Sequence, residues 1–120
     1  MAIQSAGEGG GGLVDTPAQD GFVDVGRISD FRPGVGREVL VGRLRVAIFR
    51  LDEGFFAIDN LCLHQAGPLA DGAVEEGVVT CPWHGWSYDL RTGILVQDGK
   101  MRVSCHRTRL VGDVVQVRLA

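Results

Sequence analysis

Two short runs of the sequence each pair a cysteine with a histidine. The first run is Cys62-Leu63-His64, and the second is Cys81-Pro82-Trp83-His84. Thiolates and imidazoles are both common metal ligands, so each run can supply two ligands to a metal centre. Residues 65–80 separate the two runs, and turn-forming prolines and glycines lie beside both. The pattern predicts two metal-binding loops that face each other.

The spacing within the first run bears on which metal is bound. Structural zinc sites usually leave two to four residues between paired ligands, which lets both side chains reach one ion. Cys62 and His64 have a single residue between them. In an extended chain such side chains point the same way from Cα atoms about 7 Å apart. This suits two adjacent metal atoms better than one, although two Cys and two His could also hold a tetrahedral zinc ion.

The full pattern, C-x-H followed by C-x2-H, resembles the Rieske ferredoxin family, the ferredoxin components of aromatic-ring dioxygenase systems. Residues 81–89, with the sequence CPWHGWSYD, extend the match. The resemblance implies one Rieske-type [2Fe–2S] cluster per chain. In that arrangement Cys62 and Cys81 bind one iron, and His64 and His84 bind the other. A structural zinc module is the alternative from another class.

The two histidine ligands change the charge of such a cluster. An oxidised [2Fe–2S] cluster with four thiolates carries two negative charges, and two neutral imidazoles in place of two thiolates bring it to zero. An electron enters a neutral cluster more easily than a dianion. Rieske centres accordingly span about −150 to +300 mV, against about −400 mV for plant-type ferredoxins. The resemblance therefore implies one-electron transfer at moderate potential, without catalysis by the chain itself.

Residues beside the ligands bear on that potential. Tyr88 matches the tyrosine that donates a hydrogen bond to a ligand sulfur in high-potential members of the family. The alternative is an ordinary strand aromatic with its hydroxyl at the surface. Respiratory members have a serine where this chain has Trp86, and a disulfide where it has Gly67 and Trp83. We therefore expect a potential toward the low end of the Rieske range.

The same loops contain residues with expected structural roles. Pro68 and Pro82 are expected to shape the loops. Gly67 and Gly85 are expected to allow the backbone to approach the cluster closely. The two tryptophans, Trp83 and Trp86, either shield the cluster, face a partner or cap the core of the domain.

The remaining cysteine and histidine, Cys105 and His106, are adjacent. Neighbouring residues on a strand face opposite ways, and Cys105 alternates with Val103. We expect Cys105 to be a buried core thiol and His106 to lie at the surface. With only three histidines in the chain, too few remain for the two-His, one-carboxylate iron site of a catalytic oxygenase subunit.

Composition sets the broad class. The chain has 120 residues, 45% of them hydrophobic, which suits one domain with a core. A net charge of −3 gives no basic field for nucleic acid or an anionic membrane. No apolar run approaches the ~18 residues of a membrane span, and the first residues do not form a secretory signal. We expect a cytoplasmic protein without a disulfide framework.

Alternation of apolar residues predicts short strands and no helix of useful length. Residues 1–20 are expected to form a flexible, Gly-rich tail, and residues 21–120 the Rieske [2Fe–2S] domain. We expect an antiparallel all-β domain. The resemblance implies stacked antiparallel sheets with the two cluster loops at one tip. Strands are predicted at residues 22–25, 38–41, 44–50, 55–59, 78–80, 86–90, 94–96, 101–105, 108–111 and 114–119. Tight turns are predicted at residues 42–43 and 112–113, and a loop at residues 65–77. We expect the strand at residues 44–50 to be buried on both sides, and Val115, Val117 and Leu119 to face inward.

The chain contains no nucleotide or flavin motif, so another protein must supply its electrons. The resemblance implies two partners: a flavin- and NAD(P)H-dependent ferredoxin reductase and a terminal oxygenase. The alternative is a small Rieske-type subunit of a larger reductase, such as assimilatory nitrite reductase. Neither interpretation includes a nucleic-acid or membrane partner.

Overall fold

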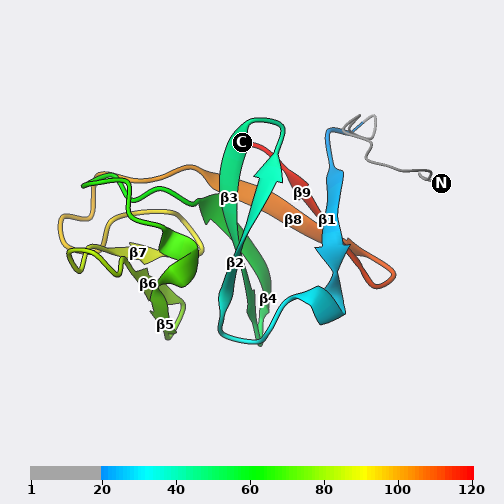
Figure 1. The fold of residues 1–120 in the computed structure, drawn as a ribbon, viewed down its shortest axis with the longest axis horizontal. Helices are drawn as coiled ribbons and strands as arrows, with labels where there is room; N and C mark the ends of the chain where they lie inside the picture. Colours follow the sequence, from blue (N-terminus) through cyan, green and yellow to red (C-terminus); the bar gives the residue numbers. More distant parts are fainter. Residues whose placement is uncertain (1–19) are drawn as a thin grey trace.

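Two antiparallel sheets make up the fold in the computed structural model, which describes residues 20–120 (Figure 1). Six strands form the larger sheet in the order β1-β9-β8-β4-β3-β2, and three form the smaller one in the order β5-β6-β7. The predicted tail, residues 1–20, lies outside the described residues except for Asp20. The elements are β1 (Val23–Arg27), η2 (Ile28–Asp30), β2 (Gly36–Val41), β3 (Leu44–Leu51), β4 (Gly54–Asp59), η3 (Leu69–Asp71), β5 (Ala73–Glu75), β6 (Val78–Thr80), β7 (Ser87–Asp89), β8 (Cys105–Val111) and β9 (Val114–Arg118).

Strand β3 joins two hydrophobic cores. Its residues alternate in direction, so Val46 and Ile48 face one core while Ala47 and Phe49 face the other. All four are fully buried, which confirms the predicted burial of this strand on both sides. The core around Val46 and Ile48 also contains Val115 of β9. The core around Ala47 and Phe49 extends into the smaller sheet and includes both cysteines of the two motifs.

The predicted all-β class is confirmed, and most predicted strands are present. The hairpins at Gly42-Arg43 and Gly112-Asp113 join β2 to β3 and β8 to β9 as expected. Residues 94–96 pair back on β7 through a single bridge between Tyr88 and Leu95. Among residues 20–120 no helix has both the length and the apolar character that a membrane crossing requires.

Three local predictions were wrong. Residues 101–104 are not part of a strand, because Asp98 accepts hydrogen bonds from the backbone N–H groups of Lys100 and Met101 and holds a turn there. Residues 65–77 were expected to be loop, yet they contain η3 and β5. Leu119 was expected to face inward but is 38% exposed, because the β1–β9 pairing ends at Val117.

Candidate metal centre

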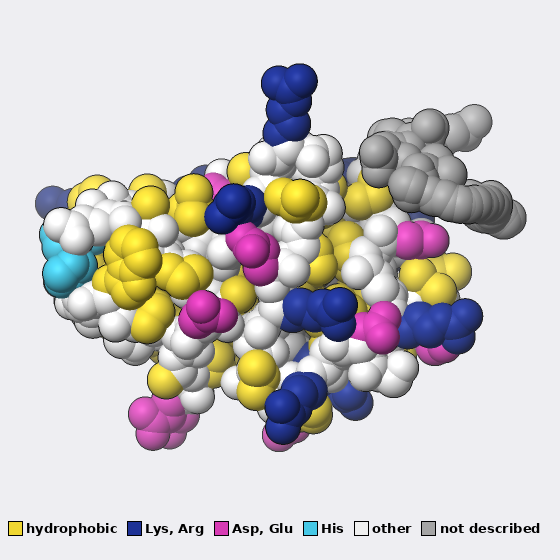
Figure 2. Space-filling model, in the orientation of Figure 1, with side chains coloured by type: hydrophobic (Ala, Val, Ile, Leu, Met, Phe, Trp, Pro, Cys, Tyr) yellow, Lys and Arg dark blue, Asp and Glu magenta, His cyan; other side chains and the backbone are white. Residues whose placement is uncertain are grey.

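The two predicted loops lie together at one end of the molecule, beyond the three-stranded sheet (Figure 1). The first loop follows β4 and leads to η3, and the second joins β6 to β7. Cys62 and Cys81 are buried, whereas His64 and His84 are exposed. The two imidazole rings are 4.8 Å apart between centroids and nearly perpendicular. Exposed histidine side chains gather at this end beside apolar ones (Figure 2).

The two loops share one backbone pattern. In the first, the N–H of Cys62 donates to the carbonyl of Gly67, and the N–H of Ala66 donates to the carbonyl of Cys62. In the second, Cys81 donates to Trp86, and Gly85 donates to Cys81. Each loop is therefore a six-residue turn that begins at its cysteine. The fifth residue is left-handed in both, with φ of 57° at Ala66 and 78° at Gly85.

The side chain of Tyr88, on β7, contacts the first loop. It is fully buried, and its hydroxyl oxygen is 3.0 Å from the backbone nitrogen of Leu63 and 3.2 Å from Cys62 Sγ. The hydroxyl accepts the Leu63 N–H, and toward a metal-bound thiolate, which carries no proton, it can only donate. The pKa of Tyr88 is raised above its ordinary value, mainly by burial and secondly by the hydrogen bond to Cys62, so the hydroxyl keeps its proton. The alternative position, with the hydroxyl at the surface, is not the one observed.

The second thiol is held differently. Burial raises the pKa of Cys81, and the neighbouring Cys62 thiol raises it further, because two thiolates side by side repel each other. The backbone N–H groups of Trp83 and His84 act in the opposite direction by donating to the sulfur. A bound cation favours both thiolates at once, so this donor set suits a metal.

A test of fit comes from Gly67. A Cβ atom at this position would lie 2.6 Å from Cys81 Sγ, closer than real side chains approach. The first loop thus packs its bare backbone on the thiol of the second. A Cβ atom added at Gly85, by contrast, would have no other atom within 4 Å. The expected close approach is observed at Gly67, whereas Gly85 serves the left-handed turn.

The number of donors also suits a binuclear centre. A [2Fe–2S] cluster asks for only two side chains on each iron. Two buried thiols and two adjacent imidazoles match that requirement, and the residues present fit the cluster.

The aromatic and proline residues take different positions. Trp86 stacks on His64, with centroids 4.7 Å apart and planes 13° apart, and packs against the core. Trp83 is 55% exposed. Its ring lies over Gly67. Two prolines also flank the loops: the half-buried Pro68 precedes η3, and the exposed Pro82 follows Cys81.

Sequence reasoning did not identify two polar residues that anchor the loops. Asn60 is 2% exposed, and its side chain accepts the N–H of Ala70 and donates to Glu38. The Asn60 side chain therefore links the start of the first loop to Ala70, which follows the end of that loop. Gln97 accepts the N–H of Ser87 and donates to the carbonyl of Gly85, which anchors the second loop. The available signal was an Asn directly after a predicted strand and two residues before a candidate ligand.

A third polar contact joins the loops. Gln65 Oε1 lies 2.6 Å from His84 Nε2, across the gap between the two turns. Gln65 was also not identified from the sequence, because no local pattern indicates which side chain it faces.

His106 is not at the surface as predicted. It is 5% exposed, and its Nε2 lies 2.8 Å from Asp59 Oδ1 while Nδ1 accepts the N–H of Ala120. Alternation correctly turned His106 away from Cys105, but both faces of β8 are covered at this point. Cys105 is partly buried and packs against the core, with its thiol facing the carbonyl of Arg91.

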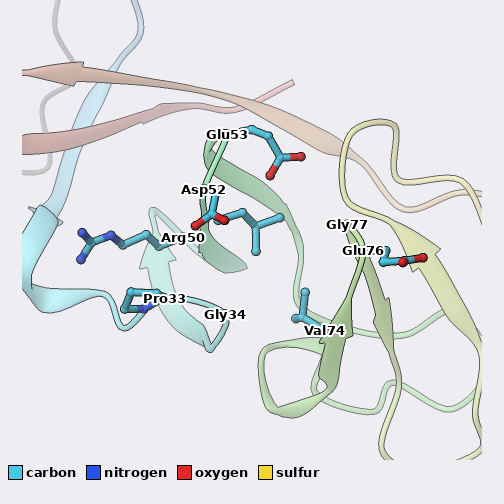
Figure 3. A pocket seen from close by; sticks show the side chains of 9 residues that line it. Pro33, Gly34, Arg50, Asp52, Glu53, Val74, Glu76 and Gly77 are labelled. Carbon is cyan, nitrogen blue, oxygen red and sulfur yellow. The ribbon is translucent and has the colours of Figure 1, made fainter.

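A hollow of about 500 Å³ lies away from the loops (Figure 3). It separates the β3–β4 turn, with Asp52 and Glu53, from the β5–β6 turn, with Glu76. None of the four predicted ligands lines it. The hollow is therefore not part of the candidate metal centre.

Comparison with known proteins identifies a matching family. Residues 21–109 match the model of the Rieske [2Fe–2S] domain. Ferredoxin CarAc of Metapseudomonas resinovorans is 34% identical over 67 residues, covering 55% of this chain and 63% of that protein. The anthranilate 1,2-dioxygenase ferredoxin subunit of Burkholderia cepacia is 36% identical over 69 residues, covering 58% and 64%. The chain thus spans less than two thirds of each of these relatives.

Solved structures agree in fold. The ferredoxin of carbazole 1,9a-dioxygenase from Nocardioides aromaticivorans matches with a TM-score of 0.77 and 26% identity, covering 82% of this chain and 98% of that one. A putative NADH-dependent nitrite reductase small subunit from Mycobacterium tuberculosis gives 0.75 and 26%, covering 82% and 96%. A complex of reduced oxygenase and oxidized ferredoxin in carbazole 1,9a-dioxygenase gives 0.74 and 26%, covering 82% and 93%.

Proposed function

Because the chain belongs to the Rieske [2Fe–2S] domain family, we propose that it carries single electrons to a terminal oxygenase of an aromatic-ring dioxygenase system. Its cofactor is a Rieske-type [2Fe–2S] cluster, and the family match favours this cluster over the zinc alternative. The observation that carries the proposal is the grouping of two buried thiols and two exposed imidazoles at one end of the molecule. The cluster supplies a one-electron acceptor when bound.

The proposed ligands of the cluster are the four side chains of the two motifs. Cys62 and Cys81 are to hold one iron, and His64 and His84 the other. The burial of the thiols supports this assignment, because it keeps water from the sulfur-bound iron. Tyr88 and the backbone of the second loop support the sulfurs with hydrogen bonds. Gly67, Pro68, Pro82, Gly85, Trp83 and Trp86 are proposed to shape and cover the loops.

The ligand set has a direct test. Replacing His64 or His84 with Cys exchanges a neutral imidazole for a thiolate and adds negative charge to the cluster. We expect the reduction potential to fall in a variant that keeps two irons per chain. An unchanged potential in such a variant would contradict the assignment of that histidine.

The exposed imidazoles are the proposed exit for electrons. They lie among apolar side chains, since Leu61, Leu63 and Trp83 are 43%, 44% and 55% exposed. Residues 60–68 and 81–88 contain no Asp, Glu, Lys or Arg. An uncharged surface with several exposed apolar side chains is typical of a protein-interaction site. The named oxygenase–ferredoxin complex of a similar protein supports this class of partner.

A flavin- and NAD(P)H-dependent reductase is the proposed electron donor. The chain is also proposed to act in the cytoplasm, where the free thiol of Cys105 suits a reducing compartment. Residues 21–120 are proposed as the working domain, of which residues 21–109 match the family model.

The likeness to a nitrite reductase small subunit favours one alternative, a fixed subunit of a larger reductase. A carrier must leave its donor to reach its acceptor, whereas a subunit stays bound. The test supplies reductase and oxygenase from a carbazole or anthranilate dioxygenase system in tenfold molar excess over this protein. A carrier supports many turnovers of oxygenase product per chain. One turnover or none, together with stable co-purification with a reductase subunit, would favour the alternative.

A further inference from the structure

We propose that Gln65 positions His84 for metal binding and lowers the reduction potential of the cluster. The inference rests on the proposed ligand set, in which His84 binds iron. Its basis is the contact of 2.6 Å between Gln65 Oε1 and His84 Nε2. Both residues are exposed, so neither is held in place by the core.

The chemistry of the contact fixes the roles of the ring nitrogens. An amide carbonyl oxygen can only accept a hydrogen bond, so His84 Nε2 must carry the proton and donate it. The lone pair of the neutral imidazole then lies on Nδ1. Gln65 therefore leaves Nδ1 as the nitrogen of His84 that binds a metal, and it limits rotation of the ring.

The shared backbone of the two loops explains why these side chains meet. Both turns begin at a cysteine and close with the same pair of hydrogen bonds. Gln65 is the fourth residue of the first turn, and His84 is the fourth residue of the second. Equivalent positions of two facing turns thus supply an acceptor and a donor to each other.

An acceptor on the outer N–H makes an imidazole a stronger electron donor to its metal. Stronger donation stabilises the oxidised iron and lowers the reduction potential. His64 has a different surrounding, because its ring stacks on Trp86 and the structure of residues 20–120 gives its imidazole no hydrogen bond. The two proposed histidine ligands are therefore unequal, and the Gln65 contact acts on one of them alone.

The test measures the reduction potential of the loaded protein by direct electrochemistry. Gln65→Leu keeps the bulk of the side chain and removes the acceptor, and Gln65→Glu provides a stronger acceptor. Leu63→Glu is the matched control, because it places the same charge on the same exposed loop. Iron content and the thermal melting curve of each variant show whether the fold and the cluster are intact.

We expect Gln65→Leu to raise the equilibrium constant for reduction about threefold to tenfold, where tenfold is about 59 mV for one electron. Gln65→Glu should shift it in the opposite direction, and by more than Leu63→Glu does. The inference is overturned if Gln65→Leu leaves the potential unchanged or lowers it, or if the two glutamate variants behave alike.

A second measurement separates positioning from a general effect on the loop. Pulsed EPR of the reduced protein, labelled with ¹⁵N-histidine, reports the outer nitrogens of both ligands. We expect Gln65→Leu to change the coupling of one outer nitrogen and leave the other as it was. Two unchanged couplings would contradict the contact. If the unmodified protein itself gave no Rieske EPR signal, the proposed function would be overturned. Failure of the proposed function is therefore distinguishable from failure of the inference about Gln65.

Discussion

The two loops have the same backbone but carry different side chains at equivalent positions. Both are six-residue turns that begin at a cysteine, so Cys62 and Cys81 are buried in the same way. The histidine is the third residue of the first loop and the fourth of the second. His64 is therefore equivalent in position to Trp83, and His84 to Gln65. A repeated scaffold places the thiols symmetrically, while a shift of one residue makes the imidazoles unequal.

The loops also differ in how they tolerate close packing. The fifth residue is left-handed in both, but it is Ala66 in the first and Gly85 in the second. The sixth residue is Gly67, pressed against the other loop, in the first and Trp86, stacked on His64, in the second. Steric contact therefore constrains the first loop at Gly67, whereas the left-handed backbone constrains the second loop at Gly85.

The symmetry of the cysteines gives the largest expected effect. Cys62→Ala or Cys81→Ala removes one of the two protein ligands proposed for one iron, and each should abolish the cluster almost completely. The measurement is iron and labile sulfide per chain. Cys105→Ala is the control, because its thiol lies apart from the loops, facing the carbonyl of Arg91, and it should retain the cluster. If only one of the two cysteine variants kept its iron and sulfide, the two loops would not be equivalent.

Glycine substitutions test the difference between space and conformation. Gly67→Ala places a Cβ 2.6 Å from Cys81 Sγ, and it should destabilise the protein by about 3 kcal/mol and reduce the iron content. Gly85→Ala meets no atom and costs only the left-handed conformation, about 1–2 kcal/mol. Denaturant titration of both variants measures the difference. Equal losses of unfolding free energy in the two variants would contradict the distinction between steric contact at Gly67 and backbone conformation at Gly85.

The sulfur of the first loop is bonded by a side chain, whereas backbone groups of Trp83 and His84 bond the sulfur of the second. Tyr88→Phe removes a donor from Cys62 and leaves the N–H of Leu63 without its acceptor, which costs about 1–2 kcal/mol. The reduction potential should also fall, because the hydrogen bond stabilises the reduced cluster.

Ser87→Ala is the control for this prediction. It removes the hydrogen bond to Thr80 at the base of the second loop, without contact to either sulfur. Its potential should stay close to that of the unmodified protein. A potential that falls equally in both variants would assign the effect to the loop base and not to the hydroxyl on sulfur.

The smallest expected effect concerns Ala66. Its left-handed φ of 57° is unfavourable for a side chain with a Cβ. Ala66→Gly should stabilise the protein by about 1 kcal/mol or less, because relief of strain is partly offset by the greater freedom of glycine in the unfolded chain. A melting temperature raised by a few degrees would show that Ala66 is strained, as expected for a side chain at this position. A lowered melting temperature would contradict that strain.

Much of this architecture was predictable from local patterns. Alternation located β2, β3, β9 and the second half of β8, and turn residues located their hairpins. The spacing of the Cys and His residues pointed to two facing loops. Such features depend on residues near one another in sequence, which is why one sequence suffices to find them.

The contacts that were missed join residues far apart in the chain. Asn60 bonds Glu38, Gln65 bonds His84, and His106 bonds Asp59. Whether a polar residue is exposed or buried depends on what covers it, as His106 demonstrates. Alternation gives the direction of a side chain, but the partner that it meets follows from the pairing of distant strands.

The most direct test of the proposed ligand set is the EPR spectrum of the dithionite-reduced protein, with iron and labile sulfide assayed on the same sample. We expect a rhombic signal with a low average g value, and two irons with two sulfides per chain. An EPR-silent protein with one zinc ion per chain would contradict it, and would make Cys62, His64, Cys81 and His84 a structural site.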